Sequence, residues 1–93
     1  MEFEWDPQKA AKNLQKHKVP FAEAATVFDD PLSVAVADPD HSMEEDCFII
    51  VGQSYRRRLL IVSFAERGDR IRIISARELT RAERRAYEEE IYE

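Results

Sequence analysis

The sequence predicts an α+β domain in which helices pack on one face of a four-stranded antiparallel sheet. Apolar residues recur at helical spacing near both ends of the chain, and four β-rich segments occupy the middle. Most of these segments are joined by short turns. Successive short turns favour an antiparallel meander, so the expected order of elements is ααββββα.

The first helix is expected to begin at Pro7 and to continue from Gln8 to His17. Asp6 is a suitable N-cap before it, and Pro7 fits the first helical position. Ala10 and Leu14 are four residues apart, so both are expected to face the core. A different stripe, away from the core, then holds Lys9, Lys12, Asn13 and Lys16, with His17 at the border between the two.

A shorter second helix, Phe21 to Phe28, follows Pro20. The four strands are expected at Leu32–Ala37, Cys47–Gln53, Leu59–Phe64 and Arg70–Ala76. In the last strand the alternation of polar and apolar residues breaks at Ile74. Thr80 and Glu83 form a capping box, which predicts a final helix running to about Tyr92.

Length and composition predict one folded domain spanning residues 1–93. The chain has 93 residues, of which 44% are hydrophobic, enough for one modest core. No apolar segment approaches the ~20 residues that cross a bilayer, and the acidic N-terminus does not resemble a signal peptide. We therefore expect a cytoplasmic protein without membrane contact. The single cysteine, Cys47, excludes an internal disulfide and cannot form a metal site alone.

The charge is distributed unevenly along the chain. The net charge is −5, which argues against indiscriminate binding of nucleic acids. Residues 21–52 contain eight acidic residues and no Lys or Arg, whereas residues 53–85 contain ten Arg and four acidic residues. Two interpretations are open: a solvated surface of uneven composition, or a basic patch for a polyanion whose acidic flanks limit nonspecific binding.

Several blocks of residues together match one known family. They are Phe3-Glu4-Trp5-Asp6-Pro7, Lys9, Asn13, Lys16-His17, Phe21 through Asp29-Asp30-Pro31, Asp40-His41-Ser42, Gly52, Leu59-Leu60-Ile61-Val62, Glu66-Arg67-Gly68, Arg72-Ile73-Ile74-Ser75-Ala76-Arg77, Thr80, Glu83-Arg84 and Tyr87. With these blocks, nearly the whole chain resembles the BrnT family of bacterial ribonuclease toxins. The resemblance implies a RelE-like fold and RNA cleavage without a metal or other cofactor.

The resemblance also implies partners. A BrnA-type antitoxin with a ribbon-helix-helix domain would neutralise the toxin, and operator DNA would be contacted only through the toxin–antitoxin complex. The chain departs from the family pattern at two helix ends, where Lys18 replaces a common Gly and Pro20 replaces the usual cap. It also has Cys47 in place of a basic residue, and Tyr55–Arg58 in a turn that usually contains Gly.

Cleavage of RNA without a metal requires a base for the ribose 2′-hydroxyl, an acid for the leaving oxygen and cations for the phosphate. We expect the catalytic groups to be His17, Glu66, Arg67 and Arg77, and the RNA-binding groups to be Lys9, Lys16 and Arg72. Because five positions separate Arg72 from Arg77, a regular strand would point them to opposite faces.

Structural interpretations of the same residues remain open. His17 could simply end a helix, Glu66 and Arg67 could form a turn ion pair, and Arg77 could pair with Glu78 or Glu83. His41 lies beside Asp40 in an acidic loop, where stabilising the loop is the simpler role. Trp5 and Tyr87 could stack on bases, although Trp5 before a helix cap more often packs on Ala10 or Leu14.

A rival function is a non-catalytic module that binds its antitoxin and contributes to transcriptional autoregulation. The acidic net charge and Cys47 favour this rival, whereas the Lys16-His17, Glu66-Arg67-Gly68 and Ser75-Ala76-Arg77 blocks favour the enzyme.

Overall fold

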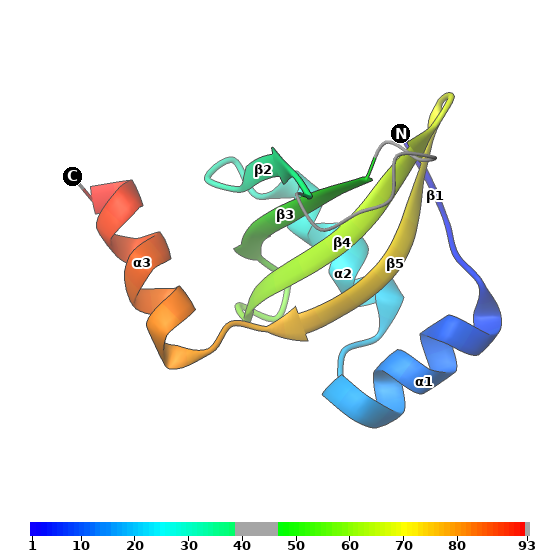
Figure 1. Cartoon of the computed structure of the whole chain (residues 1–93), viewed down its shortest axis with the longest axis horizontal. Helices are drawn as coiled ribbons and strands as arrows, with labels where there is room; N and C mark the ends of the chain where they lie inside the picture. The colour runs from blue at the N-terminus through cyan, green and yellow to red at the C-terminus, as the bar shows by residue number, and fades with distance from the viewer. Residues whose placement is uncertain (39–46, 93) are drawn as a thin grey trace.

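The computed structural model describes residues 1–38 and 47–92 of the chain (Figure 1). In chain order the elements are β1 (Glu2–Glu4), α1 (Pro7–His17), α2 (Phe21–Thr26), the 3-10 helix η1 (Val27–Asp29), β2 (Val34–Ala37), β3 (Cys47–Gln53), β4 (Leu59–Arg67), β5 (Arg70–Glu78) and α3 (Arg81–Tyr92). The predicted second helix is therefore divided, because its last turn tightens into a 3-10 helix before Pro31. The expected acidic loop with His41 lies outside the described residues.

The sheet is mixed and has five strands, in the order β1-β5-β4-β3-β2. Strand β1 runs parallel to β5, and the other neighbours are antiparallel. The prediction of a four-stranded antiparallel sheet with the order ααββββα is therefore wrong. Three residues are too few for a strand alternation to be recognised in a sequence. Cross-strand ion pairs hold β1 in place, among them Arg72 Nη1 to Glu4 Oε2 at 2.9 Å.

The hydrophobic core lies between one face of the sheet and helices α1 and α2. Its buried members are Val19, Phe21, Ala24, Val27, Ile50, Leu60, Val62, Phe64, Ile71, Ile73 and Ala76. Phe28 contacts Phe64 edge to face, with ring centroids 4.9 Å apart. Trp5 packs edge to face on Phe21, with ring centroids 6.0 Å apart, so its ring contacts the start of α2.

A β-bulge in β5 changes which side chains share a face. Ser63 pairs with Ser75, but the next residue of β4, Phe64, pairs with Ile73, so Ile74 is the extra residue. Ile73 and Ala76 both enter the core. Arg72 and Arg77 therefore both lie on the opposite face, although an unbroken strand would separate them.

Helix α3 does not lie on the same face as α1 and α2, and the expectation that all helices cover one face is wrong (Figure 1). Its N-terminus has the predicted capping box: the Thr80 N–H donates to Glu83 Oε1 at 2.9 Å, and the Glu83 N–H donates to Thr80 Oγ1 at 3.2 Å. The Tyr87 hydroxyl donates to the Leu32 carbonyl at 3.0 Å, which ties α3 to the segment before β2.

Candidate functional site

Helix α1 is attached to β5 by the side chain of Asn13. Its Nδ2 donates to the Ala76 carbonyl at 2.9 Å and its Oδ1 accepts from the Ala76 N–H at 3.0 Å. Nδ2 also donates to the Val19 carbonyl at 2.9 Å. Asn13 is buried and Leu14 is 46% exposed, so the expectations that Asn13 lies away from the core and that Leu14 faces it are both wrong. Strand β1 pairs only with Arg70–Arg72, so the backbone groups further along this edge of β5 need another hydrogen-bond partner. Helix α1 therefore turns Asn13, and not Leu14, towards β5.

Three of the expected site residues surround this attachment point. All three are neighbours of Asn13 on the helix surface, because residues three or four positions apart lie on the same side of a helix. Lys9 is four positions before Asn13, Lys16 is three after it and His17 is four after it. The lysines are exposed and His17 is half-buried. Within residues 1–38 and 47–92, none of the three side chains makes a hydrogen bond or an ion pair. They are therefore available to a ligand beside the end of β5.

Arg77 follows Ala76 on β5, and a carboxylate on α3 holds its guanidinium. Nη1 donates to Glu83 Oε1 at 2.8 Å and Nη2 donates to Glu83 Oε2 at 3.0 Å. Hydrogen bonds from Arg77, and then from the Thr80 backbone, lower the pKa of Glu83 to about 2. The same ion pair raises the pKa of Arg77. Both groups are therefore charged at neutral pH.

Arg72 lies on the same face of β5 as Arg77. It is half-buried and pairs with Glu4, whose pKa is lowered first by the hydrogen bond from Arg72. Because α1 follows β1 and is attached at Ala76, it runs along the edge of β5, whereas the two arginines leave the same strand from the face opposite the core. We call Lys9, Lys16, His17, Arg72 and Arg77 the α1–β5 cluster.

Glu66 and Arg67 are not part of this cluster. They are exposed at the end of β4, where Glu66 pairs with Ile71 and Arg67 with Arg70. Arg77 pairs with Ile61. Ile61 and Glu66 are five positions apart on β4, which corresponds to roughly 17 Å along the strand. One catalytic centre therefore does not contain all four residues that the sequence suggests.

The basic turn before β4 contains a buried ion pair that sequence reasoning did not identify. Arg58 Nε donates to Glu23 Oε2 at 2.8 Å, and the Ser54 hydroxyl donates to the same oxygen at 2.7 Å. Glu23 is 2% exposed, and the hydrogen bond from Arg58 is the main cause that lowers its pKa. Arg58 therefore joins α2 to the turn, whereas Arg56 and Arg57 are exposed.

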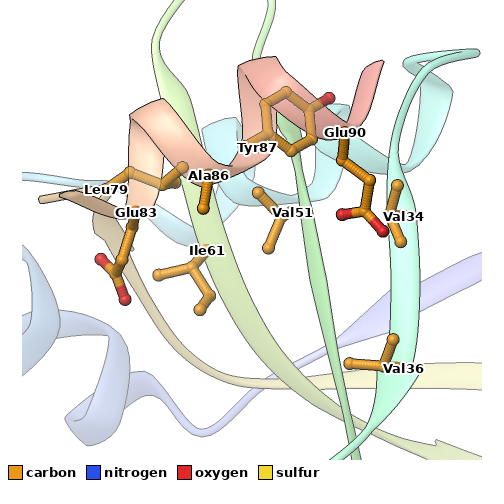
Figure 2. A pocket seen from close by; sticks show the side chains of 9 residues that line it. All are labelled: Val34, Val36, Val51, Ile61, Leu79, Glu83, Ala86, Tyr87 and Glu90. Atoms are coloured by element: carbon orange, nitrogen blue, oxygen red, sulfur yellow. The ribbon is translucent and has the colours of Figure 1, made fainter. Parts of the chain in front are cut away.

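An apolar groove of about 270 Å³ separates α3 from the sheet face that carries Arg77. It is lined by Val34, Val36, Val51, Ile61, Leu79, Glu83, Ala86, Tyr87 and Glu90. Figure 2 shows Val51 and Ile61 directed from the sheet towards Ala86. Val34 and Val36 on the edge strand are 38% and 54% exposed. Glu83 connects the groove with the α1–β5 cluster, because it lines the groove and binds Arg77.

The comparison with protein families decides the identity of the chain. Residues 5–83 match the family described as "Ribonuclease toxin, BrnT, of type II toxin-antitoxin system". The chain belongs to the BrnT family. It is accordingly a ribonuclease toxin, with RNA as its target and an antitoxin as its partner. No curated protein gives a match.

A solved structure supports the BrnT fold. The 1.1 Å crystal structure of the Brucella abortus ribonuclease toxin BrnT matches with a TM-score of 0.65 and 23% sequence identity. The match covers 87% of this chain and 99% of that one. At this level of identity, the likeness shows the common fold.

Two further features limit the kinds of site in the described segments of this BrnT chain. No group of three or more His, Cys, Asp or Glu side chains in them is arranged to hold a metal ion. No helix in them is long and apolar enough to span a membrane.

Proposed function

We propose that this BrnT chain is an endoribonuclease that cleaves RNA without a metal ion, and that the α1–β5 cluster is its RNA site. The observation that carries the proposal is the attachment of α1 to β5 through Asn13. This attachment supports a surface that continues around the edge of β5, with two lysines and a histidine from α1 on one side of the edge and two arginines from β5 on the other. A phosphodiester strand requires a row of cations with a proton carrier beside one of them.

In the proposed reaction the ribose 2′-hydroxyl attacks the adjacent phosphorus and the bond to the 5′-oxygen breaks, which leaves a 2′,3′-cyclic phosphate. His17 accepts the proton of the 2′-hydroxyl, because a neutral imidazole is a base with a lone pair for it, and the 5′-oxygen leaves with a proton taken from water. Arg77 stabilises the negative charge that develops on the phosphate oxygens. Lys9, Lys16 and Arg72 bind neighbouring phosphates.

Glu66 and Arg67 receive a different role because of their distance from Arg77. We propose that they contact the same RNA strand several nucleotides away, at the β4–β5 turn. If Glu66 and Arg67 are catalytic, as the sequence suggests, they belong to a second centre at that turn. A variant that lacks only these two side chains would then lose RNA affinity but not the chemical step.

For the antitoxin we propose a ribbon-helix-helix protein of the BrnA type, with operator DNA contacted through the antitoxin complex. Its docking surface on the toxin is the apolar groove under α3. The exposed Val34 and Val36 support a partner with aliphatic side chains, and the Glu90 carboxylate at the groove supports a Lys or Arg in that partner. An antitoxin segment in this groove would lie beside Glu83 and Arg77, so it would compete with RNA.

One observation favours the rival function, a non-catalytic antitoxin-binding module. Arg72 and Arg77 are both occupied by carboxylates of the chain itself, Glu4 and Glu83. If these ion pairs persisted in the presence of RNA, neither arginine would stabilise a transition state.

Growth and RNA measurements in bacteria test the proposed function. Expression of the chain alone should arrest growth and produce fragmented RNA with 2′,3′-cyclic phosphate ends. Co-expression of the antitoxin encoded beside it should restore growth. Normal growth with intact RNA, at a confirmed level of soluble folded protein, would support the non-catalytic module instead.

A further inference from the structure

The hydrogen bonds of Arg77 leave one edge of its guanidinium open. Nη1 uses both of its N–H groups, one to Glu83 Oε1 and one to the Glu78 carbonyl at 3.2 Å. Nη2 uses one N–H for Glu83 Oε2. Among the residues that the structure describes, no acceptor faces the Nε–H or the second N–H of Nη2.

These two free N–H groups are adjacent and parallel, and they form the lateral fork of the guanidinium. Such a fork binds two oxygens of one phosphate in the same way that the terminal fork binds a carboxylate. The side chain of Arg77 is 39% exposed, so a ligand can reach it. From this geometry we infer that Glu83 is a positioning residue, which holds Arg77 by the terminal fork so that the lateral fork binds the scissile phosphodiester.

Glu83 is itself fixed, which is what a positioning role requires. Its Oε1 accepts hydrogen bonds from the Thr80 N–H and from Nη1 of Arg77, and its backbone lies in the first turn of α3. The orientation of the guanidinium is therefore set by the start of the helix and not by one flexible side chain alone. An ordinary surface ion pair lacks this second anchor.

In a positioning role, Glu83 affects the affinity for RNA and the rate of the chemical step differently, whereas a purely structural role would lower both together. The Glu83 carboxylate reduces the net positive charge near Arg77, so it does not strengthen RNA binding in the ground state. It fixes the direction of the lateral fork, which matters when charge develops on the phosphate oxygens. Removal of the carboxylate charge should therefore lower kcat while RNA affinity stays equal or increases.

The test uses the full chain and rests on the proposed cleavage function. Glu83→Gln keeps the size of the side chain and a capping-box residue, but removes its charge. Thr80→Ala is the matched control, because it weakens the helix cap while the backbone N–H that Glu83 accepts remains. Affinity is measured with a single-stranded 2′-O-methyl RNA that cannot be cleaved, and kcat with the corresponding ribo-oligonucleotide.

For Glu83→Gln we expect kcat to fall by about tenfold to a hundredfold, with affinity for the 2′-O-methyl RNA unchanged or tighter. Thr80→Ala should lower the melting temperature but change kcat by less than about threefold. The Nε–H resonance of Arg77, in ¹⁵N-arginine-labelled wild-type protein, should shift when this RNA is added.

Three outcomes would overturn the inference. A wild-type kcat in Glu83→Gln, while Arg77→Ala is inactive, would reject the positioning role and leave the proposed function intact. An equal fall of kcat in Thr80→Ala would mean that Glu83 acts only through the cap of α3. A wild-type rate in Arg77→Ala would remove Arg77 from the site, and the proposed role of Arg77 in cleavage would fail with it.

Discussion

Asn13 occupies the place of a neighbouring strand beside Ala76. Its side-chain amide both donates to and accepts from the Ala76 backbone, at 2.9 and 3.0 Å, as a strand residue would. The contact allows β1 to end at Glu4 and the chain to continue as a helix along the same edge of the sheet. The position of α1, and with it that of Lys9, Lys16 and His17, depends on this one side chain.

Asn13→Ala should lower the free energy of unfolding by about 2–3 kcal/mol, because it leaves buried backbone groups of Ala76 and Val19 without partners. Urea denaturation measures the loss, and amide hydrogen exchange at Ala76 should accelerate. Lys12→Ala, an exposed change on the same helix, should shift the unfolding free energy by less than about 0.5 kcal/mol. Equal stabilities of the two variants would contradict the attachment.

The buried pair of Glu23 and Arg58 predicts a stability change that depends on pH. Glu23→Gln should cost about 3 kcal/mol at pH 7, because the guanidinium keeps its charge without a carboxylate partner. Arg56→Gln is the control, since Arg56 is exposed and 3.9 Å from Glu23, and it should cost less than about 0.5 kcal/mol.

The sign of the pH dependence follows from the lowered pKa of Glu23. The carboxylate stabilises the fold fully above its ordinary pKa of 4.5, and the contribution is lost as the pH falls towards the lower folded value. Denaturant titrations should therefore show the difference between wild type and Glu23→Gln shrinking below pH 4.5. A difference that is constant from pH 7 to pH 3 would argue against a charged Glu23.

Lys18 adopts the left-handed backbone conformation at the C-terminus of α1, with φ 61°. Lys18→Gly should stabilise the protein by about 0.5 kcal/mol, because relief of the strain exceeds the extra chain entropy of glycine. Lys16→Gly, inside the helix, should instead destabilise it by about 1 kcal/mol. Thermal unfolding compares the two variants. A melting temperature for Lys18→Gly below that of wild type would show that the backbone at Lys18 is not strained.

The groove under α3 predicts a variant that separates antitoxin binding from RNA cleavage. Val36→Asp places a charge among the apolar lining and should weaken antitoxin binding by more than tenfold, roughly the effect of one lost apolar contact together with a buried charge. Its rate of RNA cleavage should remain that of wild type. Tyr55→Asp is the control, because Tyr55 is 71% exposed on a different turn. Titration calorimetry that gives equal affinities for both variants would exclude the groove as the docking surface.

Local patterns in the sequence predict most elements of the fold. The strand Cys47–Gln53 has the predicted bounds because its centre is an unbroken β-rich run, and the capping box at Thr80 begins α3 as expected. Strand β1 is missed because parallel pairing between Glu2–Glu4 and Arg70–Arg72 is a tertiary event without a local signal. The side of the sheet that α3 covers is also decided by long-range contacts, here Tyr87 with Leu32.

The candidate site is less predictable than the fold. The break in alternation at Ile74 is visible in the sequence, but only the pairing with β4 shows that it is a bulge that brings Arg72 and Arg77 to one face. Helical periodicity alone puts Leu14 in the core, because it does not count the hydrogen bonds that bury Asn13. The distance between Glu66 and Arg77 follows from the pairing register of β4 and β5, and this register cannot be read from the sequence.

The central claim is that a ribonuclease centre lies at the α1–β5 cluster and operates without a metal ion. The most direct measurement is the single-turnover cleavage rate of a defined single-stranded RNA in EDTA, for wild type, His17→Ala and Lys16→Gln, each with a wild-type melting transition. We expect cleavage by wild type and a loss of ~100-fold or more in His17→Ala with RNA affinity retained. Lys16→Gln should keep the rate at saturating RNA but weaken affinity and flatten its salt dependence. A wild-type rate in His17→Ala, or no cleavage by wild type until a metal is added, would contradict it.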